Sequence, residues 1–143
     1  MTPISIVIIT LNEAERIGNI LRDLAQQSYQ NFEVIVVDSG SSDNSVALIR
    51  DRGLRCEVIP AREFGHGRTR NYLASLSQGD FLVFLTQDAK PAHADWLRHL
   101  VDACSVDDSV AGAFGPHRAH MQARHVTHKE LEQHFAGFGD KVS

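Results

Sequence analysis

The sequence has little cysteine and no excess of basic charge. Only 2 of its 143 residues are cysteine, and Cys56 and Cys104 lack the spacing of metal ligands. We therefore expect two small buried hydrophobic residues in a reducing compartment, without a disulfide. The formal net charge is -4 and no Lys/Arg run offsets it, which argues against a nucleic-acid partner bound by broad phosphate neutralisation. Any phosphate ligand must therefore be met by a few local groups.

Long apolar runs are also missing. No run approaches the length that spans a membrane, and the apolar stretch Ile4–Ile9 follows the N-terminus without a basic region or a cleavage site. We therefore expect a soluble, cytoplasmic segment, and the full-length protein could associate with the inner face of the membrane. The length, with 43% hydrophobic and 22% charged residues, is typical of one globular domain covering residues 1–143.

The sequence does contain regularly alternating strand and helix patterns. Apolar or β-branched stretches predict strands at Ile4–Ile9, Phe32–Val37, Cys56–Ile59, Phe81–Leu85 and Val110–Phe114. One helical pattern follows Asn12, which forms a capping box with Glu15, and another follows Ser42 or Asp43. Further helical patterns lie at Arg68–Ser77, at Trp96–Cys104 and after Thr127. Short connections between these elements predict an α/β fold with a mainly parallel, doubly wound sheet.

The stretch Phe81–Leu85 is apolar without alternation and ends at Gln87 and Asp88. Such a run is typical of a strand buried on both faces in the middle of a parallel sheet. Ligands of open α/β sheets bind beyond the carboxyl ends of the strands, so Asp88 is a candidate for chemistry. The alternative is that Asp88 only starts a turn before Pro91.

A strand order of 3-2-1-4, common in doubly wound sheets, would bring the ends of the first and fourth strands together. The turn after the first strand reads T-L-N-E-A-E and not G-x-G-x-x-G, which disfavours a dinucleotide site. A carboxylate such as Asp88 suits Mg²⁺ or Mn²⁺ bridging a diphosphate. Arg68 and Arg70 could add charge-assisted hydrogen bonds to the phosphates.

Four motifs carry a resemblance to a known family. They are S-I-V-I-I-T-L-N-E at Ser5–Glu13, Q-N-F-E-V-I-V-V-D-S-G-S-S-D-N-S at Gln30–Ser45, G-R-T-R-N at Gly67–Asn71 and F-L-T-Q-D-A at Phe84–Ala89. Over about residues 4–115 the chain resembles the nucleotide-sugar half of a family 2 glycosyltransferase with the GT-A fold. The T-Q-D-A form and the H-G-R-T-R-N segment are most similar to the rhamnosyltransferase-like branch.

The resemblance implies roles for individual residues. It implies that base and ribose are held by Thr10, Asn12 and Asp38, and that the nucleotide lies beside Arg70 or Asn71. His66 and Gln87 would lie near the donor sugar, and Asp88 would be the surviving acid of the D-x-D metal motif. Thr86 replaces the first acid of that motif, so the metal would be arranged mainly by Asp88 and the diphosphate.

The family's catalytic base lies in the half that follows the D-x-D strand, and we expect this chain to be truncated at its C-terminus before that half. No catalytic residue is therefore assigned. The uncovered surface and strand edge would favour a two-fold homodimer.

Asp43 is expected only to cap a helix, and the histidine pairs His117/His120 and His125/His128 are expected to be surface groups because H-x-x-H alone is a weak metal signature.

The resemblance thus implies transfer of a sugar from a nucleotide-diphosphate donor, such as dTDP-rhamnose, to a glycan or lipid-linked acceptor. Two alternatives stay open. One is a nucleotidyltransferase with a related sheet, although the turn after the first strand lacks the usual Gly-rich basic loop. The other is a non-catalytic nucleotide-binding module.

Overall fold

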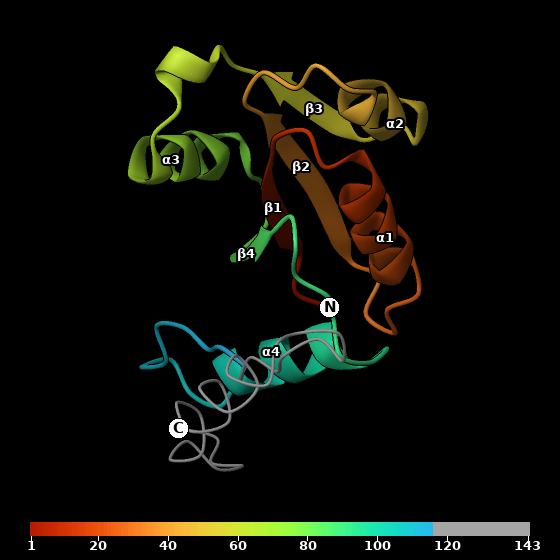
Figure 1. Ribbon diagram of the computed structural model, residues 1–143. Helices are drawn as coiled ribbons and strands as arrows, with labels where there is room; N and C mark the ends of the chain where they lie inside the picture. The colour runs from red at the N-terminus through yellow and green to blue at the C-terminus, as the bar shows by residue number, and fades with distance from the viewer. Residues whose placement is uncertain (116–143) are drawn as a thin grey trace, which may run out of the picture. The chain divides into compact units, whose positions relative to one another are not determined.

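The computed structural model describes residues 1–115, and the chain divides after Trp96 into two units that are described separately. The first unit alternates strands and helices (Figure 1). Its elements are β1 (Ile4–Thr10), α1 (Ala14–Ala25), β2 (Phe32–Asp38), α2 (Ser45–Asp51), β3 (Arg55–Val58), the 3-10 turn η1 (Ala61–Glu63), α3 (His66–Leu76) and β4 (Phe81–Thr86). The helix predicted after Thr127 and the paired histidines lie outside the described residues.

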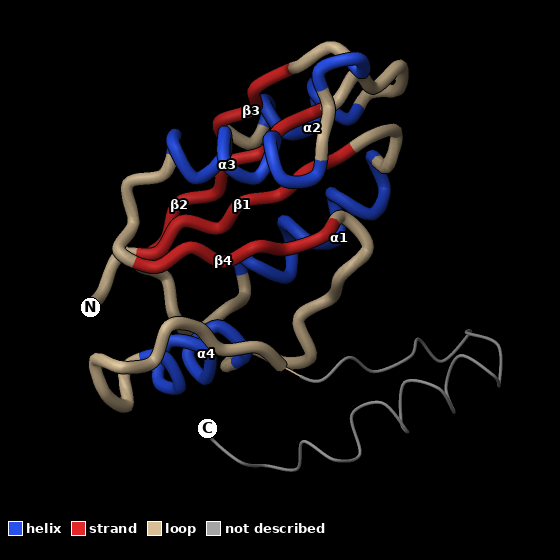
Figure 2. The backbone as a smooth tube through the Cα atoms, turned by 90° about the vertical axis from the view of Figure 1, so that its left-hand side faces the viewer, coloured by secondary structure: helices blue, strands red, loops and turns tan. Residues whose placement is uncertain are grey.

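The four strands form one parallel sheet with the order β3-β2-β1-β4, which confirms the predicted order and the α/β class. Figure 2 shows the strands running side by side. The register places Thr10 opposite Asp38, and Ile9 opposite Thr86. The carboxyl ends of β1, β2 and β4 therefore meet at one edge of the sheet, where ligands of open α/β sheets bind.

Helices cover both faces of the sheet, as expected for a doubly wound fold: α1 and α2 lie on one side and α3 on the other (Figure 1). Beneath α3, Leu73 packs with Val7, Ile35 and Val37 in a buried cluster. Burial of side chains of this size stabilises the fold by about 1.5–3 kcal/mol each. This core fixes α3 against β1 and β2, and so fixes the position of the residues at its N-terminal end.

Strand β4 is not buried on both faces, so that prediction is wrong. Within the described residues β4 pairs with β1 alone, and it lies at the edge of the sheet. Leu82 and Phe84 are 39% and 50% exposed. An apolar run indicates a strand but does not show whether that strand has one neighbouring strand or two. The sequence pattern alone therefore favoured a position in the middle of the sheet.

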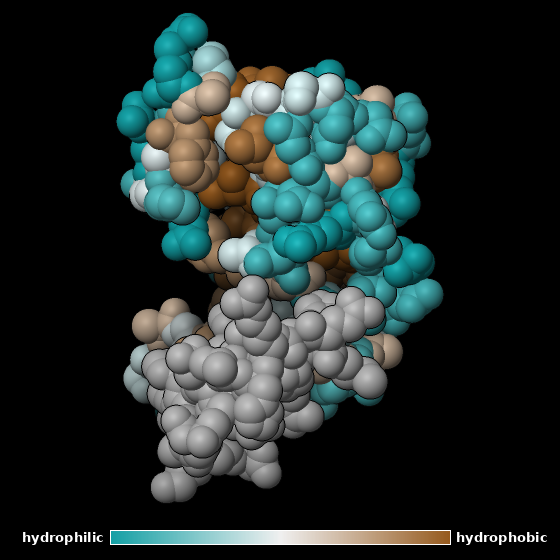
Figure 3. Space-filling model, in the orientation of Figure 1, coloured by the Kyte–Doolittle hydropathy of each residue, from teal (hydrophilic) through white to brown (hydrophobic). Residues whose placement is uncertain are grey.

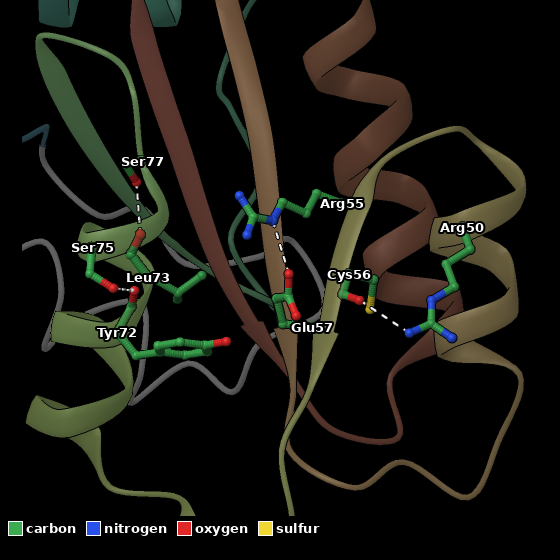
Figure 4. A network of polar contacts seen from close by, with 8 residues as sticks. All are labelled: Arg50, Arg55, Cys56, Glu57, Tyr72, Leu73, Ser75 and Ser77. Carbon is green, nitrogen blue, oxygen red and sulfur yellow. Dashed lines mark hydrogen bonds and ion pairs between the residues drawn. The ribbon is translucent and has the colours of Figure 1, made fainter.

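Strand β3 borders the opposite edge of the sheet and carries Cys56. Both cysteines are free, and Cys56 is buried, where burial raises the pKa of its thiol above the ordinary value. The Nη2 of Arg50 donates a hydrogen bond to the Cys56 carbonyl at 3.2 Å, and Arg55 pairs with Glu57 at 2.9 Å (Figure 4). Arg50 therefore links α2 to β3.

The second unit begins at Leu97, and helix α4 (Trp96–Cys104) matches the predicted helix. The prediction of a strand at Val110–Phe114 is wrong, because these residues have no regular structure and Phe114 is 71% exposed. The stretch contains one β-branched residue and is interrupted by Gly112, and both features weaken a strand. Within residues 1–115, no helix is long and apolar enough to cross a membrane.

Candidate functional site

A cavity of about 350 Å³ opens at the carboxyl ends of β1 and β4, beside the start of α3. It is lined by Val7, Ile9, Thr10, Leu11, Ser39, Phe64, His66, Arg70, Leu73, Phe84, Leu85, Thr86, Gln87 and Asp88. Five of the sequence-predicted site residues belong to this lining, namely Thr10, His66, Arg70, Gln87 and Asp88. Figure 3 shows hydrophobic residues, in brown, between more polar surfaces in the upper part of the molecule.

A second hollow lies between α1 and α2 and has a volume of about 430 Å³. Its lining includes Glu15, Arg22 and Arg52, but none of the residues that the sequence predicts to bind nucleotide. It lies along α1 and α2, on the face of the sheet opposite α3. We therefore take the smaller cavity as the candidate site, which we call the carboxyl-edge cavity.

Thr10 ends β1 and is buried. Its hydroxyl donates a hydrogen bond to Oε1 of Gln87 at 3.0 Å, and the Leu11 amide donates to the same oxygen at 2.9 Å. The Thr10 carbonyl accepts hydrogen bonds from the amide of Ser39 at 3.1 Å and from its hydroxyl at 3.3 Å. Thr10 therefore joins the loops that follow β2 and β4.

Asn12 does not form the predicted capping box. Helix α1 begins after Glu13, whose own side chain makes no capping hydrogen bond. Asn12 adopts a left-handed backbone with φ of 50°, a region that Asn tolerates better than most residues. Its Oδ1 accepts hydrogen bonds from the amides of Ser42 at 2.7 Å and Asp43 at 3.4 Å. Asn12 is thus engaged with the loop after β2, which competes with capping its own helix.

Asp38 ends β2 and is only 1% exposed. Its Oδ1 accepts hydrogen bonds from the amides of Gly40 at 3.0 Å and Ser41 at 2.7 Å, and its Oδ2 accepts one from the Ser41 hydroxyl. A carboxylate has about four acceptor positions, and Asp38 uses three of them to close its own turn. Neither Asp38 nor Asn12 lines the cavity. Gly40, with φ of 105°, supplies the backbone that this turn requires.

Asp43 serves the start of α2, as expected. Its Oδ1 accepts a hydrogen bond from the Ser45 amide at 2.9 Å and another from the Ser45 hydroxyl. These bonds hold the pKa of Asp43 below its ordinary value. The Asp43 Oδ2 also accepts a hydrogen bond from the amide of Ala14 at 3.3 Å. Asp43 in the loop after β2 therefore contacts both Asn12 and Ala14, at the start of α1.

The α3 side of the cavity is aromatic and basic. The guanidinium of Arg70 lies 6.0 Å from the centroid of the Phe84 ring, within the range of a cation–π contact. The rings of Phe64 and His66 meet edge to face at 5.1 Å. His66 and Arg70 are exposed and line the cavity, whereas Asn71 is exposed on α3 outside the lining.

Asp88 is exposed at the rim of the cavity. Within residues 1–115, no three His, Cys, Asp or Glu side chains gather in an arrangement that could hold a metal ion. A single carboxylate fits Mg²⁺ or Mn²⁺ when substrate phosphates and water supply the remaining ligands, because these ions often bind through one or two carboxylates plus phosphates. The residues present therefore fit a divalent ion held jointly with a diphosphate.

Sequence reasoning missed several residues at this edge. Ser39 and Ser41 hold Thr10 and Asp38 in place, and the serine-rich turn after β2 was a signal of such side-chain bonding. Phe64 and Phe84 line the cavity, but nothing in an apolar or loop phenylalanine distinguishes a cavity wall from core.

The chain is similar in sequence to known glycosyltransferases along most of its length. The family model "Glycosyl transferase family 2" matches residues 5–139. The O-antigen chain rhamnosyltransferase RfbN of Salmonella typhimurium is 35% identical over 122 residues, which cover 84% of this chain and 38% of that protein. The chain thus spans less than half the length of this relative.

Two solved structures share the fold. The mannosyltransferase PcManGT from Pyrobaculum calidifontis, in complex with GDP-Man and Mn²⁺, aligns with a TM-score of 0.62 and 25% identity, covering 70% of this chain and 31% of that chain. S. aureus TarS 1-349, in complex with UDP-GlcNAc, aligns with a TM-score of 0.61 and 25% identity, covering 72% and 31%. Together with the match over residues 5–139, these findings show that the chain belongs to glycosyl transferase family 2.

Proposed function

We propose that this chain binds a nucleotide-diphosphate sugar in the carboxyl-edge cavity for transfer of the sugar to a glycan or lipid-linked acceptor. The observation that carries the proposal is that one cavity brings together Thr10, Arg70 and Asp88 from three separate elements. A buried hydroxyl, a guanidinium and an exposed carboxylate are the groups that a nucleoside, a diphosphate and its divalent ion require.

The donor that we propose is dTDP-rhamnose. The support is the 35% identity to a rhamnosyltransferase, together with the T-Q-D-A motif at Thr86–Ala89. The names of the solved relatives mention GDP-Man and UDP-GlcNAc, so family membership leaves the base and the sugar open. Binding measurements must therefore compare dTDP with UDP and GDP.

Each residue has a proposed role in donor binding. The remaining acceptor position of Asp38 would take a hydrogen bond from the base or the ribose, supported by Thr10, Asn12 and Asn71. Arg70 would bind the diphosphate through charge-assisted hydrogen bonds. Asp88 would hold Mg²⁺ or Mn²⁺, which as a Lewis acid neutralises charge on the departing diphosphate. His66 and Gln87 would lie near the sugar.

Two further parts of the proposal concern partners. We propose that the acceptor is met at the inner face of the membrane. A two-fold dimer of this chain would form through β4, which among residues 1–115 pairs on one side only and exposes Leu82, because an unpaired strand edge favours pairing with another chain. Light scattering over a concentration series tests the dimer, and a constant monomer mass would contradict it.

Calorimetry with dTDP, UDP and GDP, each with and without Mn²⁺, tests donor binding. We expect Mn²⁺ alone to bind hardly at all, because one carboxylate does not offset the dehydration of the ion. Mn²⁺ should bind when one of the three nucleoside diphosphates is present. Asp88→Asn should abolish the increase in nucleotide affinity that Mn²⁺ gives. Asp80→Asn is the matched control, since the exposed Asp80 precedes the other end of β4. The absence of binding to all three nucleotides would contradict the proposal.

A non-catalytic nucleotide-binding module is the second candidate. The observation that favours it is Thr86 at the position of the first D-x-D acid, in a region without a cluster of metal ligands among residues 1–115. A donor-hydrolysis assay separates the two candidates. The assay is run on this chain and on one extended at its C-terminus, because no catalytic base is assigned within residues 1–143. Metal-dependent release of nucleoside diphosphate by either supports the transferase, whereas tight binding without release by both supports the module.

A further inference from the structure

Gln87 occupies the position between Thr86 and Asp88, and its side-chain oxygen is fully used within the protein. It accepts the Thr10 hydroxyl at 3.0 Å and the Leu11 amide at 2.9 Å, across 77 and 76 residues of sequence. An amide oxygen offers two acceptor positions, and both of these bonds have ordinary lengths. The oxygen of Gln87 therefore binds the end of β1 and has no acceptor position left for a ligand.

The backbone around Gln87 forms a closed turn. The Ala89 amide donates a hydrogen bond to the Thr86 carbonyl at 3.1 Å, which makes Gln87 and Asp88 the two central residues of a four-residue turn. The conformations of two central turn residues depend on each other, because they share one peptide plane and one closing hydrogen bond. Fixing Gln87 to β1 therefore also limits where the Asp88 carboxylate can lie.

The contact continues to the other side of the site through Thr10. The carbonyl of Thr10 accepts hydrogen bonds from Ser39, which directly follows Asp38. One buried residue thus contacts both the loop after β2 and, through Gln87, the turn that carries Asp88. This arrangement sets the separation between the two carboxylates that the proposed function assigns to nucleoside and metal.

We infer that Gln87 is a positioning residue that holds the Asp88 turn against the end of β1 and so prepares the metal-and-diphosphate side of the site before the ligand arrives. This inference rests on the proposed function, in which Gln87 also lies near the donor sugar, and it concerns the side-chain oxygen of Gln87 alone. Pre-organisation of this kind improves affinity because the ligand does not have to order the turn when it binds.

The test is Gln87→Met, which keeps a long unbranched side chain and removes the acceptor oxygen. Affinity is measured by calorimetry for three probes: dTMP without metal, dTDP with Mn²⁺, and dTDP-rhamnose with Mn²⁺. We expect affinity for dTDP with Mn²⁺ to fall about fivefold to tenfold, the size of one net hydrogen-bond contribution. Affinity for dTMP should not change, and dTDP-rhamnose should weaken by the same factor as dTDP.

Each other pattern overturns the inference. A loss confined to dTDP-rhamnose would make Gln87 a sugar contact. A loss with dTMP as well would mean that the whole cavity has changed, and unchanged affinity for all three probes would remove any role. Gln26→Met is the control, since the exposed Gln26 follows α1 and does not line the cavity.

A second pair of variants tests the same contact from the side of β1. Thr10→Val removes the hydroxyl that donates to Gln87, and Thr10→Ser keeps it. We expect Thr10→Val to weaken dTDP with Mn²⁺, Thr10→Ser to restore most of the affinity, and the Thr10→Val/Gln87→Met double variant to lose less than the sum of the two. Additive losses would overturn the inference. If circular dichroism shows that Gln87→Met is unfolded, Gln87→Leu is measured with the same three probes, because Thr10 is itself proposed to support nucleoside binding.

The wild-type chain separates failure of the inference from failure of the proposed function. If the wild type binds none of dTDP, UDP and GDP with Mn²⁺, both fall together. If UDP or GDP binds in place of dTDP, the same three-probe series is run with the corresponding monophosphate and nucleotide sugar. If the wild type binds and Gln87→Met matches it, only the positioning role falls.

Discussion

Asp38 both closes its own turn and is the proposed acceptor for the nucleoside, and one substitution separates these roles. In Asp38→Asn the remaining Oδ1 can still accept the amides of Gly40 and Ser41, while the charge is lost. Because hydrogen bonds to charged groups contribute about 1.5–3 kcal/mol, nucleotide affinity should fall roughly tenfold to a hundredfold. Calorimetry on folded protein measures this, with Asp51→Asn as the control, since the exposed Asp51 ends α2 and does not line the cavity. Equal affinities for Asp38→Asn and wild type would leave Asp38 as a turn residue only.

A second prediction at the scale of the residue concerns Asp43 and Ser45. The hydrogen bond from the Ser45 side chain is the largest cause of the lowered pKa of Asp43, whose ordinary value is 3.8. Ser45→Ala should therefore raise this pKa toward the ordinary value, which an NMR titration of the carboxyl carbon follows. Asp107, whose pKa is lowered by Ser109, is the internal control and should not move. An unchanged Asp43 titration in Ser45→Ala would contradict the assignment.

The direction of this shift also gives the sign of the pH dependence. A pKa that is lower in the folded state means that folding favours the charged carboxylate. The contribution of Asp43 to stability is therefore present above pH 3.8, and it is lost as the pH falls from 3.8 through the lower folded-state pKa. Ser45→Ala should narrow the difference in stability between pH 7 and pH 3.

At the scale of the element, the entry to β4 depends on Gly79. A Cβ at this position would lie 2.5 Å from the Ser5 nitrogen and 2.6 Å from the Ile4 carbonyl carbon, and backbone cannot move aside as a side chain can. The Gly79 amide also donates to the buried Ser5 hydroxyl at 2.8 Å. Gly79→Ala should therefore lower the free energy of unfolding by about 1–3 kcal/mol, as overpacking does.

Denaturant unfolding measures that loss, and Gly67→Ala is the matched control. No atom lies within 4 Å of a Cβ at Gly67, which is inside α3, so alanine there should leave stability unchanged or raise it by about 0.5–1 kcal/mol. Equal stabilities for the two variants would show that β1 and β4 do not pack as closely as described.

At the scale of the whole molecule, the parallel sheet and its order could be predicted because alternating strands and helices with short connections leave few right-handed topologies. The edge position of β4 could not, since Phe81–Leu85 is equally apolar whether it has one neighbour or two. The hydrogen bonds between Asn12 and Ser42 and between Thr10 and Gln87 join residues that are 30 and 77 positions apart in the sequence. Such contacts depend on strand register, and no local pattern encodes them.

Part of the site could also be predicted from the order of the parallel strands. Residues that directly follow a strand, such as Asp88, could be placed at the carboxyl edge because parallel strands end together. The local chemistry of each turn decides how a residue is used there. Asp38 is turned toward Gly40 and Ser41, and Asn12 toward the loop after β2, so their proposed ligand roles stay predictions.

The central claim is that a nucleoside diphosphate and its divalent ion bind at the carboxyl-edge cavity. The most direct test is an NMR spectrum of ¹⁵N-labelled protein with dTDP, to which Mn²⁺ is added in small steps. Paramagnetic broadening should be strongest for the amides of Leu11, Gln87 and Asp88, and should require dTDP. Strongest broadening at Gly18 and Leu48, which line the hollow between α1 and α2, or broadening that is the same without dTDP, would contradict the account.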